Sequence, residues 1–551
     1  MIRKSLLLVL ALVMFTPELT LGPTRFMLVT PELTLGPTYV SAAYARVAAQ
    51  SSAIDVAFAK FWDAKNPQEA AAAAAAIVNS GVTFDAALGR LKKGRTYPDT
   101  PPHGVVRLAN KISGTEFLYT LDVPASYDPS KKYQVRVQLH GGVGRPQATI
   151  RGNGSIGTLA GPDTVDQIYV LPIAWADAMW WQDVQISNLR MILDSLKRTY
   201  NVDENRVVMS GVSDGGTGAY YFAMRDTTPY ASFLPLNGFV MILANPANGI
   251  DVELYPQNLL NKPFFVVNGG KDPLYPTSAV EPYVKHLQKG GVEIDYHPQP
   301  NGVHNTAWWP EVRDPFEAFA RNHPRDPYPA KLTWEVSALG PDRRSHWLLI
   351  DKLSSAKAPK DRELLADLND MSSGNQTNFG VRVNGLHITW VVPGTNADTM
   401  GLQAGDTVIS INGRTLPQGL DLLEFLGIYR QGDKLTFHLS RDNKPVDLSG
   451  IYNPQTMTRV VPLFFHSDPV SRVDLVRDKN TIRATTRGIA EFTLLASPDV
   501  FDLAQPITVI ADGKTVFNRR VDKSLETLMK WAALDNDRTM LFGAELHIKL
   551  D

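Results

Sequence analysis

Between residues 105 and 320, short runs of β-branched and aliphatic residues alternate with longer amphipathic stretches. Strands are predicted at 135–139, 168–171, 206–209 and 263–267, and helices are predicted at 189–200, 217–225 and 280–289. This alternation indicates an α/β fold, with a mostly parallel sheet that carries helices on both faces. Ligand sites in such sheets form at the carboxyl ends of the strands, so the residues directly after each strand are the first candidates for chemistry.

The pattern changes on both sides of this segment. Residues 46–100 combine an apolar stripe at helical spacing with a run of alanines, which predicts a helical N-terminal segment. After Pro324 the chain becomes proline-rich, and residues 331–337 and 345–350 then alternate like half-buried strands. β-Rich segments return after residue 463. Because a pair of strands is only marginally stable alone, we expect these two strands to pair with the later ones in one β-sandwich.

The first 45 residues have the pattern of a secretory signal peptide. Arg3 and Lys4 precede an apolar run from Leu6 to Phe15, which is too short to cross a membrane. The sequence of residues 16–24 recurs unchanged at 30–38, which indicates a tandem duplication within the leader. We therefore expect a periplasmic or extracellular protein without a transmembrane anchor.

The amino-acid composition excludes several kinds of catalytic and binding site. The 551 residues contain no cysteine, which excludes a thiol nucleophile, disulfides, thiolate zinc sites and iron–sulfur clusters. The formal net charge of -1 lacks the excess of lysine and arginine that nucleic-acid-binding proteins show, so no nucleic-acid partner is expected. Hydrophobic residues make up 44% of the chain, which is enough to fill several cores.

A Gly-x-Ser-x-Gly pattern at residues 211–215 lies between a predicted strand and a predicted helix. In this setting it is the nucleophile elbow of α/β-hydrolases, where a strained turn exposes the serine and the helix N-terminus points its free N–H groups at the site. A serine nucleophile needs a base, and the base needs an orienting carboxylate. Asp272 and His304 follow later strands in the order Ser, Asp, His that this fold uses. We therefore predict a triad of Ser213, Asp272 and His304.

Other residues remain open as members of this triad. The alternative acids are Asp251 and Asp295, and the alternative bases are His286, His297 and His323. His286 falls within a predicted helix and His297 at the end of a strand, where surface or packing roles are expected.

A second loop at the same sheet edge predicts the oxyanion hole. His140, Gly141 and Gly142 directly follow a predicted strand, and the backbone N–H of either glycine is expected to act with that of Asp214. His140 is expected to shape this loop rather than to act as the base. For Arg145, which follows the loop, we expect a solvated surface position, with a contact to a substrate carboxylate as the alternative.

Residues 105–320 resemble secreted esterases, dienelactone hydrolases and polyhydroxyalkanoate depolymerases, and more distantly the catalytic domain of prolyl oligopeptidases. The resemblance is carried by Trp180-Trp181 and by residues 203–206, 211–216 and 270–273. It implies an α/β-hydrolase that acts without a metal or an organic cofactor. Bulky aromatic residues near the predicted site are candidates for the walls of a substrate pocket, with core packing as the alternative: Trp180, Trp181, Trp308 and Trp309.

Residues 378–383 and 401–413 resemble a bacterial-type PDZ domain. This resemblance implies that residues 379–381 form a loop whose N–H groups receive a peptide C-terminus. The loop lacks the usual leading glycine and second aromatic residue, so a purely structural module is the alternative.

These patterns together predict a secreted serine hydrolase that cleaves small or polymeric carboxylic esters through an acyl-enzyme. The alternatives are a serine peptidase of the prolyl-oligopeptidase type and a non-catalytic binding protein of the cell envelope. The predicted segments are a signal peptide (1–45), a helical segment (46–100), an α/β-hydrolase domain (101–325), a β-strand linker region (326–372), a PDZ-like domain (373–445) and a C-terminal β-rich domain (446–551).

Overall fold

The computed structural model describes residues 52–147, 166–250, 253–340, 342–354, 367–417, 419–467 and 469–550. The predicted signal peptide lies outside these residues. The chain divides into two units, residues 1–55 and 56–551, and the architecture given below is that of the second unit.

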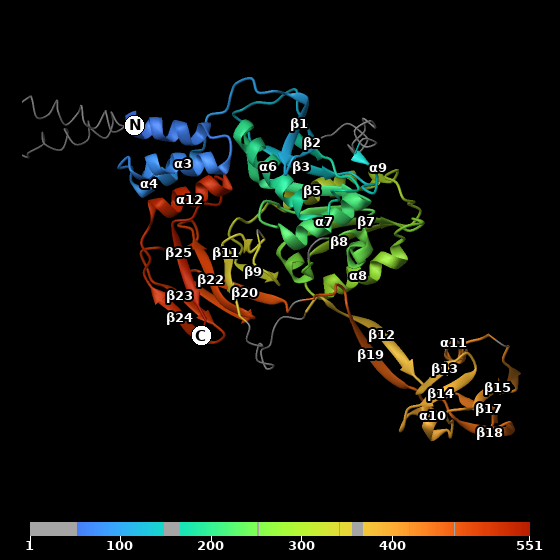
Figure 1. Cartoon of the computed structure of the whole chain (residues 1–551). Coiled ribbons are helices and arrows are strands. Elements are labelled where there is room, and N and C mark those ends of the chain that lie inside the picture. The colour runs from blue at the N-terminus through green and yellow to red at the C-terminus, as the bar shows by residue number, and fades with distance from the viewer. Residues whose placement is uncertain are drawn as a thin grey trace, which may run out of the picture. The chain divides into compact units, whose positions relative to one another are not determined.

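An eight-stranded sheet forms the centre of the region predicted as the hydrolase domain (Figure 1). Its strands run in the order β1-β2-β4-β3-β5-β6-β7-β8, antiparallel from β1 to β4 and parallel from β4 onward. This order is that of the α/β-hydrolase fold. The strands are β1 (Gly104–Ile112), β2 (Thr115–Val123), β3 (Tyr133–Leu139), β4 (Gln167–Pro172), β5 (Val202–Val212), β6 (Phe233–Leu236), β7 (Phe264–Gly269) and β8 (Ile294–Gln299).

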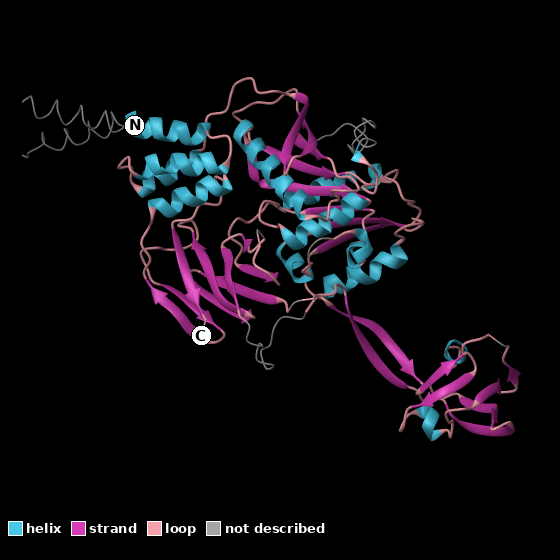
Figure 2. Cartoon of the chain, viewed as in Figure 1, coloured by secondary structure: helices cyan, strands magenta, loops and turns pink. Residues whose placement is uncertain are grey.

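Helices cover both faces of this sheet (Figure 2). In β7, Phe264 and Val266 belong to the core that contains residues of α8, whereas Phe265 and Val267 belong to the core that contains residues of α9. This division follows from the two-residue period of a strand, and it explains why strands such as β3 and β7 are buried at every position. The helices are α6 (Asp183–Thr199), α7 (Asp214–Arg225), α8 (Thr277–Lys289) and α9 (Trp309–Asn322), with short 3₁₀ helices at Val240–Ala244, Pro246–Asn248 and Pro256–Asn261.

The pairing predicted for the strands around residues 331–350 is confirmed. Strand β9 pairs with β20, and β11 pairs with β22, so segments from both sides of the PDZ region build one sandwich with a shared core. One sheet has the order β24-β23-β21-β20-β9 and the other β10-β11-β22-β25. The elements are β9 (Lys331–Val336), β10 (Arg344–Ser345), β11 (Leu348–Leu353), β20 (Ser471–Asp478), β21 (Thr481–Arg487), β22 (Ile489–Ala496), β23 (Ile507–Ala511), β24 (Lys514–Arg519), α12 (Leu525–Asp535) and β25 (Ala544–Lys549).

The N-terminal helices pack against this sandwich. Helices α3 (Pro67–Val78) and α4 (Phe84–Lys93) lie beside α12 (Figure 1). The Nη2 atom of Arg95 donates to Oδ1 of Asn536 at 2.9 Å, directly after α12. A stretch near the start of the chain therefore completes the packing of its last domain, which the periodicity of residues 46–100 alone did not predict.

The PDZ region has its own core and its own sheet, in the order β13-β14-β15-β17-β18 with β16 beside β15. An antiparallel ribbon of β12 (Asp370–Asn378) and β19 (Gln455–Pro462) links it to the rest of the chain. Its other elements are β13 (Val381–Asn384), β14 (His387–Val391), α10 (Asn396–Thr399), β15 (Thr407–Ile411), β16 (Arg414–Thr415), α11 (Leu422–Leu426), β17 (Lys434–Arg441) and β18 (Lys444–Ile451).

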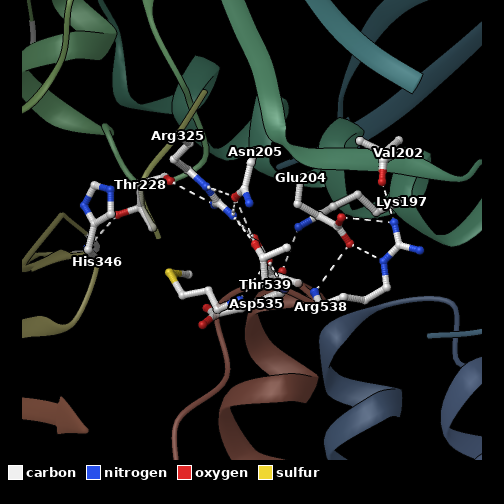
Figure 3. Close-up of polar contacts among 12 residues, drawn as sticks. Lys197, Val202, Glu204, Asn205, Thr228, Arg325, His346, Asp535, Arg538 and Thr539 are labelled. Atoms are coloured by element: carbon white, nitrogen blue, oxygen red, sulfur yellow. Dashed lines mark hydrogen bonds and ion pairs between the residues drawn. The ribbon is translucent and has the colours of Figure 1, made fainter. Parts of the chain in front are cut away.

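A buried polar network joins the sandwich to the central sheet (Figure 3). Arg325 donates from Nη2 to Oδ2 of Asp537 and to Oγ1 of Thr539, both at 2.8 Å, and the two charged side chains are 1% and 4% exposed. Arg538 binds both carboxylate oxygens of Glu204 in β5, at 2.5 and 3.0 Å. Buried charges are tolerated only when they are paired and hydrogen-bonded, so this network specifies how the sandwich docks.

Candidate active site

Ser213 occupies the turn between β5 and α7 with backbone angles of φ 57° and ψ −121°. Only a few non-glycine residues adopt a positive φ, and such strain costs about 1–3 kcal/mol, so the surrounding structure must hold it. The Ser213 N–H donates to the carbonyl oxygen of Leu236 at 2.9 Å, and its own carbonyl accepts the N–H of Thr217 at 3.0 Å. The turn is therefore tied to β6 on one side and to the first turn of α7 on the other.

Glycines make this turn sterically possible. A Cβ atom at Gly211 would lie 2.2 Å from the carbonyl oxygen of Gly215, and one at Gly215 would lie 2.2 Å from that of Leu139. Both distances are far below van der Waals contact and involve backbone atoms that cannot move aside. The glycines on either side of Ser213 thus allow α7 to approach the ends of β3 and β5 closely.

The structure brings Ser213, His304 and Asp272 into one hydrogen-bonded chain. Ser213 Oγ lies 2.8 Å from His304 Nε2, and His304 Nδ1 lies 2.7 Å from Asp272 Oδ2. Asp272 follows β7 and His304 follows β8, so the three residues come from the carboxyl ends of three parallel strands of one sheet, β5, β7 and β8. This geometry leaves Nε2 facing the hydroxyl that a general base would deprotonate.

The carboxylate of Asp272 is buried, and both of its oxygens have hydrogen-bond partners. Its Oδ1 accepts the N–H groups of Leu274 at 2.8 Å and Tyr275 at 3.0 Å, while Oδ2 faces the imidazole. The ring of Tyr275 stands edge-on to His304 with 5.5 Å between the centroids. Burial raises the pKa of Tyr275 to about 12, and the Asp214 and Asp272 carboxylates add to this, so its hydroxyl stays protonated beside the triad.

The loop after β3 lies against the serine. A Cβ atom at Gly141 would be 2.9 Å from Cβ and 3.5 Å from Oγ of Ser213. Gly142 has φ +70°, and the Val143 N–H donates to Oδ2 of Asp214 at 2.9 Å. Among the described residues the N–H groups of Gly141, Gly142 and Asp214 have no hydrogen-bond partner, so they are available to an oxyanion.

His140 holds this loop through both ring nitrogens. Nδ1 lies 2.9 Å from the carbonyl oxygen of Gly141, and Nε2 lies 3.1 Å from the backbone N of Ala174. Because the amide must donate, we assign Nε2 as the acceptor and place the proton on Nδ1. Burial lowers the pKa of His140, which favours this neutral form. Trp180 adds a third contact by donating from Nε1 to the His140 carbonyl at 2.8 Å.

The alternative acids and bases lie elsewhere or outside the described residues. His286 of α8 contacts the carbonyl oxygen of Leu368 at 2.9 Å, and His323 contacts Glu293 at 3.1 Å. His297 of β8 stacks on Phe265 and pairs with Asp295 at 2.9 Å. Asp251 is outside the described residues.

The four tryptophans predicted as pocket walls are buried, which favours the alternative of core packing. Trp180 and Trp181 are 0% and 3% exposed, and Trp308 and Trp309 are 5% and 7% exposed within the core that contains residues of α9. Burial of a large aromatic side chain is strongly favourable, and these side chains are buried in the cores of the domain. Of the four, Trp180 supports the site indirectly, through its bond to His140.

One supporting residue has no signal in the sequence pattern. Asn237 follows β6 with φ 48°, is buried, and donates from Nδ2 to the carbonyl oxygen of Asn305 at 2.9 Å. This bond holds the chain directly after His304. An isolated asparagine in a positive-φ turn becomes meaningful only when the loop that it contacts is known.

In the PDZ region, Phe379 is buried and stacks on Phe437 with 5.9 Å between ring centroids. The N–H of Gly380 is already bonded to Oδ1 of Asn378 at 2.9 Å. Strand β13 forms one end of its sheet as described. Peptide binding by this region stays a prediction.

Parts of the chain are similar to known proteins. A family model described as PDZ domain matches residues 387–434, so this part is a PDZ domain. No curated protein matches the chain. Among solved structures, a thermostable esterase is 21% identical, with a TM-score of 0.33 over 40% of this chain and 63% of the esterase. The apo form of Thermogutta terrifontis esterase 2 is 12% identical, with a TM-score of 0.31 over 41% of this chain and 97% of that chain.

An S-formylglutathione hydrolase from Staphylococcus aureus is 14% identical, with a TM-score of 0.29 over 41% of this chain and 98% of that chain. Within the described ranges, no helix is both long and apolar enough to traverse a bilayer. The same ranges hold no cluster of three or more histidine, aspartate or glutamate side chains suited to a metal ion.

Proposed function

We propose that this protein is a serine hydrolase that cleaves carboxylic esters through an acyl-enzyme. The observation that carries the proposal is the chain of contacts from Ser213 Oγ to His304 Nε2 at 2.8 Å and from His304 Nδ1 to Asp272 Oδ2 at 2.7 Å. Its serine sits on a strained elbow at the N-terminus of α7, where helix N–H groups and the loop after β3 favour negative charge.

In the proposed mechanism, Ser213 Oγ attacks the ester carbonyl while its proton passes to His304 Nε2. The carbonyl oxygen becomes an oxyanion, which accepts the N–H of Asp214 and that of Gly141 or Gly142. Each such donor is worth about 3 kcal/mol of transition-state stabilisation. The tetrahedral intermediate then expels the alcohol, which takes the proton from His304. Water activated by the same imidazole releases the acid and restores the serine.

Asp272 supports both steps without changing its protonation. Its Oδ2 holds Nδ1 of the imidazole and stabilises the positive charge that forms on His304. Its two bonds from the backbone N–H groups of Leu274 and Tyr275 hold the carboxylate in place. The proposal also includes export through the predicted leader and capture of a peptide C-terminus by the PDZ domain.

Hydrolysis of p-nitrophenyl butyrate tests the proposal, with wild type compared to Ser213→Ala. We expect release of p-nitrophenol by the wild type, a loss of at least about 10³-fold in the variant, and fluorophosphonate labelling of the wild type only. Ser130→Ala removes an exposed serine hydroxyl that contacts Asp128, before the opposite end of β3, and is expected to keep both signals.

An aminoacyl anilide separates the two enzyme classes. Faster turnover of the anilide than of the ester would favour a peptidase instead. Ester turnover that survives in Ser213→Ala, or a wild type that neither turns over ester nor reacts with fluorophosphonate, contradicts the proposal.

A further inference from the structure

Arg145 lies beside the loop that faces the nucleophile. A Cβ atom at Gly142 would be 3.6 Å from Cζ and Nε of Arg145 and 3.7 Å from Nη2. The preceding residue, Gly141, is the one that faces Ser213, with 2.9 Å between its Cβ position and the serine Cβ. The guanidinium therefore lies beside Gly142, and the residue before Gly142 is the one that faces the reacting serine.

This guanidinium has no partner in the part of the chain that the structure describes. Its side chain is exposed, and it makes no ion pair or hydrogen bond with a described residue. The carboxylate of Asp214, at the start of α7, contacts this loop: it accepts the N–H of Val143 at 2.9 Å and forms no ion pair with Arg145 within these residues. The Arg145 backbone is held, because its carbonyl accepts the N–H of Ala176 at 3.0 Å.

Arginine in this position offers a specific kind of contact. Its guanidinium remains charged at all ordinary pH values and presents several N–H groups in a planar fork, which binds a carboxylate through two parallel hydrogen bonds. An anchored arginine without an internal partner, next to the predicted oxyanion hole, thus fits an anionic group on the substrate.

Two exposed apolar side chains lie in the loops that carry the acid and the base of the triad. Leu274, two residues after Asp272, is 60% exposed, and Val303, directly before His304, is 42% exposed. The loops that carry them are packed together, since a Cβ atom at Gly269 would lie 2.5 Å from the carbonyl oxygen of Gly302. His304 must reach the oxygen of the departing alcohol, so the alcohol part of an ester lies on this side.

We propose that the substrate is an ester whose short acyl chain ends in a carboxylate bound by Arg145, and whose alcohol is apolar and meets Leu274 and Val303. This inference rests on the proposed function, because it places the acyl and alcohol parts by the roles of the triad. It assigns Arg145 as a specificity-determining residue of the site.

Two matched substrates test this assignment. Monobenzyl glutarate carries the free carboxylate, and benzyl methyl glutarate is its uncharged counterpart of the same acyl length. Release of benzyl alcohol is measured by chromatography as a function of substrate concentration. We expect the wild type to favour the monoester by about 10- to 100-fold in kcat/KM, mainly through a lower KM, since a hydrogen-bonded charge pair holds the ground state and the transition state alike.

Three variants distinguish a specific contact between Arg145 and the substrate carboxylate from a general effect of positive charge. Arg145→Gln is expected to abolish the preference by lowering kcat/KM for the monoester to the level of the diester. Arg145→Lys should restore only part of it, because an ammonium group lacks the planar fork. Lys132→Gln removes an exposed positive charge directly before β3, at the end of the strand away from Ser213, and should keep the full preference.

Equal turnover of both esters by the wild type, or a preference that survives in Arg145→Gln, overturns the inference and leaves the proposed function intact. If the wild type hydrolyses neither glutarate ester nor p-nitrophenyl butyrate, the proposed function fails and the inference fails with it.

Discussion

Replacement of Asp272 by asparagine removes one hydrogen-bond acceptor from a residue that uses all of its acceptors. The carboxylate receives the backbone N–H groups of Leu274 and Tyr275 on Oδ1, at 2.8 and 3.0 Å, and Nδ1 of His304 on Oδ2, at 2.7 Å. Asparagine has a single oxygen and an NH₂ group that only donates. The orientation that keeps both backbone bonds turns this NH₂ group toward Nδ1 of the imidazole.

In this orientation, Nδ1 has to accept a hydrogen bond, so the imidazole carries its proton on Nε2 instead. An Nε2–H group cannot take the proton of Ser213, and the general base is lost although the three side chains keep their places. Loss of the correct tautomer in a serine triad lowers kcat by about 10⁴-fold, which corresponds to about 5.5 kcal/mol of transition-state stabilisation. We expect a loss of this size for Asp272→Asn.

The assay is kcat for p-nitrophenyl butyrate, with thermal unfolding to verify that the variant is folded. Asp295→Asn is the matched control, because it makes the same change in a carboxylate that also faces a histidine, His297, at 2.9 Å but is 52% exposed. This control should stay within about twofold of the wild type. A folded Asp272→Asn protein with more than a tenth of the wild-type kcat would refute the reasoning, and so would an equal loss in Asp295→Asn.

Two further predictions concern stability, measured as the free energy of unfolding in urea. Arg325→Met should lower the free energy of unfolding by about 3–5 kcal/mol, because it leaves Asp537 as a buried carboxylate without its ion-pair partner. Lys285→Met breaks the exposed pair with Glu281 and should change the free energy of unfolding by less than about 0.5 kcal/mol. Similar losses in the two variants would contradict this prediction. Burial raises the pKa of Glu335 from the usual 4.5 to about 8. The protonated side chain therefore contributes fully to the stability below pH 4.5, and this contribution is lost as the pH rises through 8. Glu335→Gln should therefore flatten the fall in stability between pH 5 and 8, and a fall of unchanged slope would disprove it.

The central sheet and the pairing of strands in the sandwich could be predicted from the sequence, because each depends on the pattern of residues within short segments. Predicted strands 135–139, 168–171 and 206–209 lie within β3, β4 and β5, where most positions are buried because both faces of the sheet are covered. The strands at residues 331–350 could be assigned to a later sheet because two strands alone cannot bury a core. Strands β1, β2 and β6 were not predicted, since the first two are partly exposed and the third has four residues.

The role of the aromatic residues required the tertiary structure. A tryptophan near a predicted site has the same sequence pattern whether it faces substrate or fills a core, and Trp180 and Trp309 are both buried. The docking of α3 and α4 on α12 was inaccessible for a similar reason, because periodicity identifies the apolar face of a helix but not its partner.

By itself, the sequence determined the chemistry that this chain offers at one sheet edge. Glycines around Ser213, the loop at Gly141 and the order of Asp272 and His304 follow from local rules, since a strained turn tolerates few residues and parallel strands end at a common edge. Only the tertiary structure decided the distances between these groups, the tautomer of His140 and the absence of a partner for the Arg145 guanidinium among the described residues. These depend on which distant backbone atoms fill the remaining hydrogen bonds, and no local pattern of residues encodes that.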